Sequence, residues 1–541
     1  MNIDMDRWKK ILPPFALVCF VILYFCYIYY RVSDLPCNSD TACMLLEAKD
    51  ILHGNFFLAD WQLTGITFIT TDMPYFLIGT LIFGVDERAA FLAITLMYVA
   101  LVTASFLLLK DKNGKRSFWS YLLFAAIAII PTNYAIDNAR VHTSVYVWVI
   151  LAIYFADRAA EKQRIRDYIM TGLFAFLAVC GDSLGILTIT LPLLIVCITN
   201  GVKKPMKLGA SVAIGTVAGL GAEKLYLLIG GAEKNSLIWN TFAQVDTMMD
   251  KLLLCLRYPT LMLNADFFGT KIFTLQTLFY LLRLSFILFA FWIIFRSVCR
   301  YAQRKDTDRI TLFLAGGFLS VYAVFLTTNI NAGITCGRYV IYLPVLFGIL
   351  IVRCFNGINL ENIEKRKRVI YKSCIGLLCC VMLVGNQITV KPVHFDNARD
   401  RLSAFLEQQQ LYHGYAAFFD AQIVTLNTRE AVTVRAIEWE NGNFQPNYWF
   451  CKNSWYDEYA NYIIIMKDKP VQEAEFYENN GIYNLWLVFG DDKTFVSSKN
   501  VIAYFGEPER VLAFEGYDIY IYPYDISNSL FNKKVTAGSE I

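Results

Sequence analysis

The chain has 541 residues, of which 56% are hydrophobic and 15% aromatic, and its formal net charge at neutral pH is +3. So small a charge gives a nucleic-acid partner no electrostatic support, which excludes that class of protein. Apolar runs long enough to cross a bilayer recur as far as residue 387, and this pattern predicts a polytopic α-helical membrane protein.

The positions of basic residues predict the topology. The first apolar run, residues 11–31, follows Arg7, Lys9 and Lys10 and precedes no cleavage site, so we expect an uncleaved helix with a cytoplasmic N-terminus. Later linkers rich in Lys and Arg are also expected in the cytoplasm, because cytoplasmic loops carry that excess. They are residues 110–116, 157–167, 200–207, 296–309 and 353–368.

The apolar run at residues 74–84 is shorter than the roughly 20 helical residues that a crossing needs. Counting it as a span would also place the basic linker 110–116 outside and invert every later loop. We therefore expect an interfacial or re-entrant juxtamembrane helix here and about eleven spans elsewhere. The predicted spans are residues 11–31, 88–109, 117–132, 141–156, 168–181, 184–199, 208–229, 272–295, 310–327, 339–353 and 369–387.

Residues 39–53 predict another juxtamembrane helix, directly after the first span. Leu45, Ala48 and Leu52 fall on one face, so the helix should lie along the outer membrane surface. Asp40 near its start has two interpretations. It could cap the free N–H groups of the first turn, or it could supply chemistry at an outer site.

Five further charged residues lie at the same predicted level as Asp40. They are Asp72, Asp137, Arg140, Asp182 and Arg338. Polar groups at membrane depth are costly and usually line a cavity, so these residues and Asp40 predict an outward-facing polar site. The alternative is that the aspartates cap helices or turns, and that the arginines cap span ends or reach lipid headgroups.

The C-terminal residues predict a different kind of domain. Residues 1–387 form the predicted membrane domain, and residues 388–530 a small extracytoplasmic α/β domain; residues 531–541 look disordered. A helical stretch at 396–414 precedes period-two apolar runs separated by Gly, Asn and Asp. These runs are YAAFFDA, YIIIMKD, LWLVFGD and YDIYIYPYD.

The cysteines indicate little about function. Cys37 and Cys43 could close a short external disulfide, although a helix running between them argues against it. The chain shows no Cys and His spacing typical of metal ligands, no Gly-rich phosphate loop and no nucleophile elbow.

Three consecutive segments resemble glycosyltransferases of the GT-C fold, which take sugars from polyprenyl-phosphate carriers. Three features occur in the order typical of that family. The outer loop begins with an acidic residue, a Pro-containing juxtamembrane helix then ends in Phe-Gly, and an Arg begins the second span. The segments are SDTACMLLEAKDILHGN, TTDMPYFLIGTLIFG and VDERAAFLAITLMYVAL. The late GRYVIYLPVLFG and the C-terminal domain are also similar to bacterial members related to protein O-mannosyltransferases and aminoarabinose transferases.

The resemblance implies an inverting membrane glycosyltransferase that moves a sugar from undecaprenyl-phosphate to a cell-envelope glycan, lipid or protein acceptor at the outer face. It implies that Asp40 is the general base and that Asp72 is an active-site polar group. We expect Arg140 and Arg338 to supply the positive charge that stabilises the departing phosphate. Asp137 and Asp182 would contact the substrate, or a divalent metal ion if one takes part.

Two charged positions lie deeper in predicted spans and need partners in a low-dielectric setting. Arg283 is mid-span, and Glu223 and Lys224 lie in the outer part of another span. We expect a structural ion pair between Glu223 and Arg283. The alternative is that Arg283 or Lys224 meets the carrier phosphate in a lipid-facing groove.

Two other classes of protein stay open from the sequence. One is a transporter or flippase with a similar number of spans, which should show polar or Gly/Pro-broken spans paired across two halves; none stands out. The other is an assembly protein whose outer domain binds envelope components without catalysis.

The predicted topology can be tested by labelling intact cells. A cysteine introduced at Lys112 should be shielded from an impermeant thiol reagent, because its linker is basic and therefore cytoplasmic. A cysteine at Asn427 should react. Labelling of the Lys112 site from outside would overturn the eleven-span topology.

Overall fold

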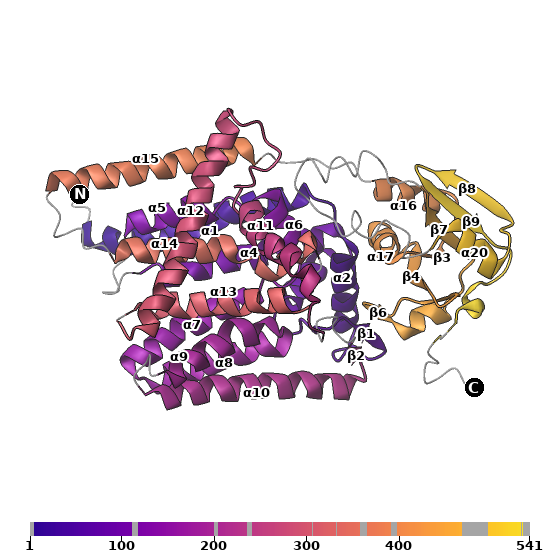
Figure 1. Ribbon diagram of the computed structural model, residues 1–541. Coiled ribbons are helices and arrows are strands. Elements are labelled where there is room, and N and C mark those ends of the chain that lie inside the picture. The colour runs from indigo at the N-terminus through magenta and orange to yellow at the C-terminus, as the bar shows by residue number, and fades with distance from the viewer. Residues whose placement is uncertain are drawn as a thin grey trace.

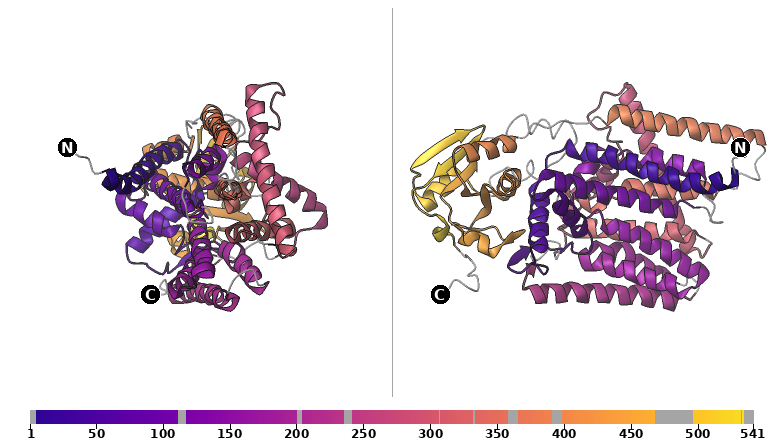
Figure 2. Two further views of the ribbon diagram at one scale, coloured as in Figure 1. Left: turned by 90° about the vertical axis from the view of Figure 1, so that its left-hand side faces the viewer. Right: turned by 180° about the vertical axis from the view of Figure 1, so that it is seen from behind.

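The computed structural model describes residues 5–110, 117–199, 204–234, 241–305, 307–331, 333–357, 365–390, 398–467, 496–531 and residue 533. The linker that contains Lys112 and most of the predicted tail, residues 531–541, lie outside the described residues. A helical part is followed by a sheet-containing C-terminal domain at one end of an elongated molecule (Figure 1). Most of the long helices run along the long axis, and the view from behind shows the same division (Figure 2, right).

The helical part contains fifteen labelled α-helices and several short elements within the described residues. The α-helices are α1 (Met5–Ser33), α2 (Ser39–Leu52), α3 (Met73–Phe83), α4 (Glu87–Ser105), α5 (Phe118–Ala128), α6 (Asn133–Asn138), α7 (Val145–Lys162), α8 (Ile165–Gly181), α9 (Leu191–Ile198), α10 (Pro205–Gly230), α11 (Met248–Met262), α12 (Leu275–Ala302), α13 (Arg309–Thr327), α14 (Leu343–Asn356) and α15 (Lys365–Thr389). The short elements are β1 (Trp61–Leu63), η1 (Phe106–Leu108), the π-helical turn η2 (Ile186–Thr190), β2 (Glu233–Lys234), η4 (Val245–Thr247) and η5 (Ile334–Val340).

In the described part of the chain, five helices are long and apolar enough to cross a membrane. They are Glu87–Leu108, Pro205–Gly230, Leu275–Ala302, Arg309–Thr327 and Lys372–Thr389. The pair η5 and α14, bent by 49°, passes the same test as one broken span. Each of the eleven predicted spans overlaps a helix, but several of these helices are short, so the count of eleven stays a prediction.

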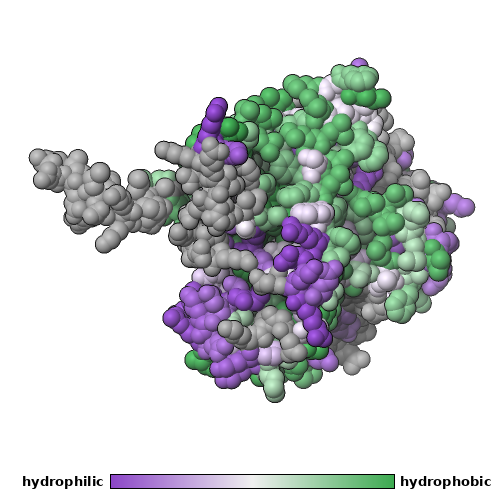
Figure 3. Space-filling model, turned by 60° about the vertical axis from the view of Figure 1, so that its left-hand side comes forward, coloured by the Kyte–Doolittle hydropathy of each residue, from purple (hydrophilic) through white to green (hydrophobic). Residues whose placement is uncertain are grey.

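The surface agrees with a protein that resides in a membrane. Apolar residues cover a broad part of one face of the molecule (Figure 3). The predicted short helix is confirmed as α3, which has only 11 residues. A helix of that length spans about 16 Å, too little for a hydrocarbon core of about 30 Å.

Helices α8 and α10 lie side by side at one edge of the helical part (Figures 1 and 2). Their backbones approach each other closely because glycines face each other. A Cβ atom built on Gly215 of α10 would lie 2.2 Å from the carbonyl oxygen of Gly172 of α8. Small residues at such contacts let membrane helices pack backbone to backbone.

The helix predicted over 39–53 is present as α2, and most of its residues are buried within the protein. Ten of its 14 residues are buried, including the polar Ser39, Thr41 and Glu47, and Leu52 at its end is exposed. The reason is that α2 packs against α3 and α4 of the helical part and against α17 (Phe418–Asn427) of the C-terminal domain.

Three ion pairs fasten the C-terminal domain to the helical part. Lys49 and Asp50 of α2 pair with Glu430 and Lys452, and Asp86 before α4 pairs with Arg429. The Asp50–Lys452 and Asp86–Arg429 distances are 3.1 and 2.8 Å. The domain is therefore held across α2 at several points.

The C-terminal domain is a mixed sheet covered by helices. Its other elements are α16 (Ala398–Gln408), β3 (His413–Ala416), β4 (Thr433–Glu440), β5 (Asn443–Pro446), β6 (Cys451–Lys452), η7 (Asn453–Asp457), β7 (Tyr462–Met466), α20 (Ser498–Phe505), β8 (Arg510–Phe514), β9 (Tyr517–Ile521) and η8 (Ser527–Ser529). The six-stranded sheet has the order β5-β4-β3-β7-β9-β8, in which β3 is parallel to β4 and β7 and the other pairs are antiparallel.

The predicted α/β character of this domain is confirmed, with one error of detail. YIIIMKD and YDIYIYPYD contain β7 and β9, and the predicted helical stretch contains α16. YAAFFDA was expected to be a strand throughout, but α17 begins at Phe418 and buries Ala421 and Val424 against the sheet. LWLVFGD lies outside the described residues.

A second, three-stranded sheet connects the two parts of the molecule. It has the order β2-β1-β6, and Gln62 of β1 pairs with Cys451 of β6 in an antiparallel register. Strand β1 follows α2, and β6 belongs to the C-terminal domain. Their pairing therefore holds the residues just before β6 next to the loop that follows β1.

The contact between α8 and α10 gives a stability prediction. Gly215→Leu should destabilise the protein by about 1–3 kcal/mol, since the added side chain must separate two backbones. Gly221→Leu on the same helix is the matched control, because a Cβ atom there meets nothing within 4 Å. The control should match or exceed the wild-type thermal unfolding midpoint in the same detergent, and equal losses in both variants would contradict the packing argument.

Candidate functional site

Asp40 is not the cap of α2. The cap is Asn38, whose side-chain oxygen accepts a hydrogen bond from the backbone N–H of Thr41. The Asp40 carboxylate instead accepts a hydrogen bond from Arg338 on η5, with 3.1 Å between Oδ2 and Nη1. The capping interpretation is therefore wrong, and the alternative that Asp40 serves a site gains support.

The Asp40–Arg338 pair borders a narrow crevice between the helical part and the C-terminal domain. Five segments that are separate in the sequence line it. The lining residues are Asp40, Thr64, Gly65, Ile66, Phe68, Val141, His142, Arg338, Tyr339, Trp449 and Phe450. Its volume of about 40 Å³ holds only a few water molecules, so a sugar would enter only if Trp449 and Phe450 moved.

The Arg338 side chain keeps donor capacity at this crevice. Its guanidinium lies over the ring of Tyr339, 5.3 Å from the ring centre, and no described residue accepts a hydrogen bond from its Nε–H group. The side chains of Arg338 and Asp40 are 26% and 14% exposed. Arg338 can thus donate to an anion that reaches the crevice while its stacking contact persists.

His142 connects the crevice to a buried carboxylate. Its Nδ1 lies 2.7 Å from Oδ2 of Asp182, and its ring packs against Phe68 and Tyr339 at centroid distances of 5.0 and 4.6 Å. The other oxygen of Asp182 accepts from the backbone N–H of Leu184 at 2.9 Å. Asp182 therefore orients the imidazole and ties it to the turn after α8.

Asp72 lies behind His142 and holds its loop in place. One oxygen accepts the backbone N–H of His142, and the other accepts the N–H and hydroxyl of Ser144 at 2.9 and 2.5 Å. Burial raises the pKa of Asp72, and the hydrogen bonds from Ser144 oppose that shift. Asp72 is fully buried and does not line the crevice, so it is a positioning residue.

Asp137 and Arg140 do not join this site. They form an ion pair with each other three residues apart, at 2.7 Å, and neither lines the crevice. The fold therefore brings Asp40, Arg338, Asp182 and Asp72 close to His142 and leaves this pair aside.

The predicted pair between Glu223 and Arg283 is wrong. Glu223 pairs with Lys234 at 2.6 Å. Arg283 is buried and donates to the carbonyl oxygens of Leu263 and Ala126 at 2.7 and 3.2 Å, so it satisfies helix and loop backbone instead of a carboxylate. Its guanidinium therefore connects α12 to the ends of α11 and α5.

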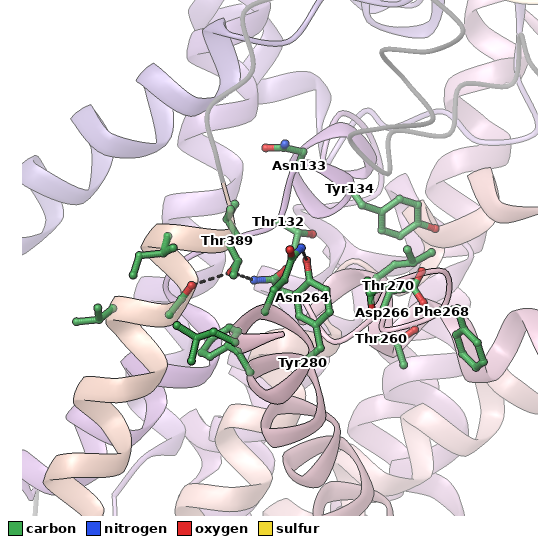
Figure 4. Close-up of a pocket in the computed structure, with 18 of the residues that line it drawn as sticks. Thr132, Asn133, Tyr134, Thr260, Asn264, Asp266, Phe268, Thr270, Tyr280 and Thr389 are labelled. Carbon is green, nitrogen blue, oxygen red and sulfur yellow. Dashed lines mark hydrogen bonds between the residues drawn. The ribbon is translucent and has the colours of Figure 1, made fainter. Parts of the chain in front are cut away.

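A larger pocket of about 1030 Å³ lies beside helix α6, which contributes Asn133 and Tyr134 to its lining (Figure 4). One part of its lining is polar: Thr132, Asn133, Tyr134, Arg257, Asn264, Asp266 and Thr270. Another part is apolar and comes from two membrane-length helices: Phe279 of α12 and Val381, Val384 and Ile388 of α15. The pocket is thus suited to an amphiphilic molecule.

Tyr134 separates this pocket from the crevice. It lines the pocket, and its hydroxyl donates to the carbonyl oxygen of Ile334 at the start of η5. Gly337 lets the ring approach, since a Cβ atom at that position would lie 2.1 Å from the hydroxyl oxygen. Arg338, the next residue, faces the crevice on the other side.

Several residues of the site escaped the sequence interpretation. The sequence analysis singles out no role for His142, and nothing in the sequence places Trp449, Phe450 or Tyr339 beside Asp40. The only usable signal for His142 was its position next to the polar cluster of Asp137 and Arg140. The large pocket gave no signal, because four separate elements form it.

The cysteines near the site are unpaired. Cys37 and Cys43, for which the sequence left a disulfide open, are both free thiols. In the part of the chain that the structure describes, no three His, Cys, Asp or Glu side chains lie close enough together to hold a metal ion.

The chain matches no protein-family model and no curated protein. The argument for a function therefore depends on the geometry described above.

Glu47 is a buried carboxyl group on the same helix as Asp40. It is 1% exposed, and no described residue offers Oε1 a hydrogen bond. Burial raises its pKa well above the ordinary value, and the charge of Asp50 adds to the shift. The folded protein therefore favours the protonated, neutral carboxyl group.

This shift predicts a pH dependence of stability. A raised folded pKa contributes stability that is complete below the unfolded pKa of about 4.3 and is lost as pH rises through the folded pKa. Relative to Glu47→Gln, which cannot titrate, the wild type should lose stability as pH rises. Thermal unfolding midpoints of both proteins between pH 5 and pH 8 measure this, and parallel profiles would contradict it.

Proposed function

We propose that the protein is an integral-membrane, inverting glycosyltransferase that moves a sugar from a polyprenyl-phosphate carrier to a cell-envelope glycan, lipid or protein acceptor. The chemistry would occur at the outer face of a cell membrane, in the crevice beside Asp40. The observation that carries the proposal is the pairing of a carboxylate with a partly exposed guanidinium in a crevice that both parts of the molecule line.

The proposed reaction uses the two charges of this pair separately. Arg338 binds the carrier phosphate, and this contact draws the guanidinium away from Asp40. Asp40 then accepts the proton of the acceptor hydroxyl while that oxygen attacks the anomeric carbon. The bond from the anomeric carbon to the phosphate oxygen breaks, and the polyprenyl phosphate leaves with the negative charge that Arg338 stabilises.

The remaining polar residues would position these groups. Asp182 holds the His142 imidazole in one orientation, and Asp72 holds the backbone of residues 142–144. Neither aspartate needs to change its charge during the reaction. In this proposal Arg140 and Asp137 support each other and leave the phosphate to Arg338.

The large amphiphilic pocket supports a lipid donor. Its apolar lining comes from α12 and α15, where an isoprenoid chain would lie, and its polar lining would receive the head of the carrier. Only Tyr134 and η5 separate the polar end from Arg338. Displacement of Tyr134 would bring the sugar phosphate to the crevice.

The role of Asp40 can be tested with purified variants in single-turnover assays, using undecaprenyl-phosphate that carries a labelled sugar. Mass-spectrometric comparison of envelope glycans with and without the protein would first identify that sugar. Asp40→Asn should lower transfer by about 10² or more, because an amide cannot accept the proton. Donor binding and the unfolding midpoint should change little, since Asn38 and not Asp40 caps α2.

Asp50→Asn provides the matched control on the same helix. Hydrogen bonds from Trp61, Asn55 and Lys452 lower the pKa of Asp50 although burial opposes this, so its loss should reduce stability and leave the rate of transfer within about twofold. Near-normal turnover in Asp40→Asn would refute its role as base. Donor binding without transfer in the wild type would instead favour a transporter.

A further inference from the structure

Helix α11 exposes an apolar face that no other described part of the chain covers. The exposed fractions of its side chains run from 40% for Leu252 to 63% for Met249, and Val245 just before the helix is 83% exposed. These residues recur at helical spacing on one side, within an arc of roughly 140° at 100° per residue. The members of this apolar stripe are Val245, Met248, Met249, Leu252, Leu253 and Leu256.

The opposite face fixes the orientation of α11. The Lys251 ammonium donates to the carbonyl oxygen of Asn331 at 2.9 Å, and the Tyr258 hydroxyl donates to that of Gly333 at 2.8 Å. Cys255 between them is buried. The apolar stripe therefore faces outward in the assembled fold and is not covered by a rotation of the helix.

Three charged residues of α11 and the turn before it lie along one edge of the stripe, whereas Lys251 lies on the opposite, buried face. Asp246, Asp250 and Arg257 follow one another at helical spacing, next to Met249 and Leu253. An apolar face with a charged border is the pattern of a helix that lies in the plane of a membrane interface. If the helix bound a protein partner in water, its apolar face would not need to continue into the apolar surface of a membrane-spanning helix.

Along the chain, the apolar stripe of α11 does continue into exposed apolar residues of a membrane-length helix. The apolar surface extends from α11 through Phe268, Ile272 and Phe273, all at least 68% exposed, to Leu275 and Leu278 at the start of α12. Helix α12 is long and apolar enough to cross a membrane, and it also exposes Leu288 farther along its length. The stripe and the outer surface of a candidate span thus form one apolar surface.

We propose that α11 lies in the membrane leaflet nearest the C-terminal domain, with its apolar stripe among the lipid chains and with Asp246, Asp250 and Arg257 at the level of the headgroups. In this position α11 forms the lipid-side wall of the 1030 Å³ pocket, which Arg257 also lines. The pocket then opens sideways into the leaflet, and a lipid enters it without crossing water. This placement goes beyond the proposed function and does not require any transfer reaction.

The test uses the full chain in bilayer nanodiscs of phosphatidylethanolamine and phosphatidylglycerol, with one photoreactive benzoylphenylalanine in place of Leu253. Illumination followed by mass spectrometry of the intact protein should show an adduct with the mass of one lipid. Leu256 is a second site on the same stripe and should give the same adduct, which protects the result against a local folding defect at Leu253.

Two exposed positions serve as controls. Leu288 on α12 should form the lipid adduct, and Tyr459 in the C-terminal domain, which is 51% exposed, should not. A lipid adduct at Leu288 but none at Leu253 and Leu256 would place the stripe in water and overturn the proposal. Crosslinking of both stripe positions to a second copy or to a co-purified protein would overturn it as well. Because the readout is an adduct mass, its failure is separate from a failure of the transferase proposal.

Discussion

The burial of α2 between the helical part and the C-terminal domain is the constraint on which the site depends. This short helix carries Asp40, Glu47 and Asp50 and is covered on most of its surface. In such a low-dielectric setting each carboxyl group must either pair with a cation or become protonated. Asp50 and Asp40 find cations, Lys452 and Arg338. Glu47 is favoured in its protonated form. The same burial brings a base candidate and an anion-binding guanidinium together from opposite ends of the helical part.

The two pockets differ in size and lining. The crevice at Asp40 is small and mostly apolar, with Asp40, His142 and Arg338 among its few polar groups, and the pairing of β6 with β1 holds Trp449 and Phe450 at its edge. The larger pocket is amphiphilic and lies toward α12 and α15. Tyr134 lines the larger pocket and contacts η5, the segment that carries Arg338 at the crevice. A closed crevice in the absence of a donor would also limit access of water to the reacting groups.

Buried polar residues beyond the crevice stabilise the architecture and take no part in the chemistry that we propose. Arg283 binds two carbonyl groups, Asp72 binds three donors of one turn, and Asp182 orients His142. A buried charge or carboxylate with such partners is costly to replace, because removal of either side leaves the other without a hydrogen bond. The two residues that we propose for the reaction, Asp40 and Arg338, are instead partly exposed and line the crevice.

The sequence by itself determined the presence of membrane-length apolar helices, the helix at 39–53, the short helix at 74–84 and the α/β character of the C-terminal domain. These features depend on composition and local periodicity, which neighbouring residues set. Only the tertiary structure decided which partner each charged side chain has. Asn38 caps α2, so Asp40 pairs with Arg338. Asp137 and Arg140 form an ion pair with each other, and Glu223 pairs with Lys234 and not with Arg283. A charged side chain in a low-dielectric interior takes the partner that lies within hydrogen-bond distance, and that distance depends on how elements far apart in the chain pack together.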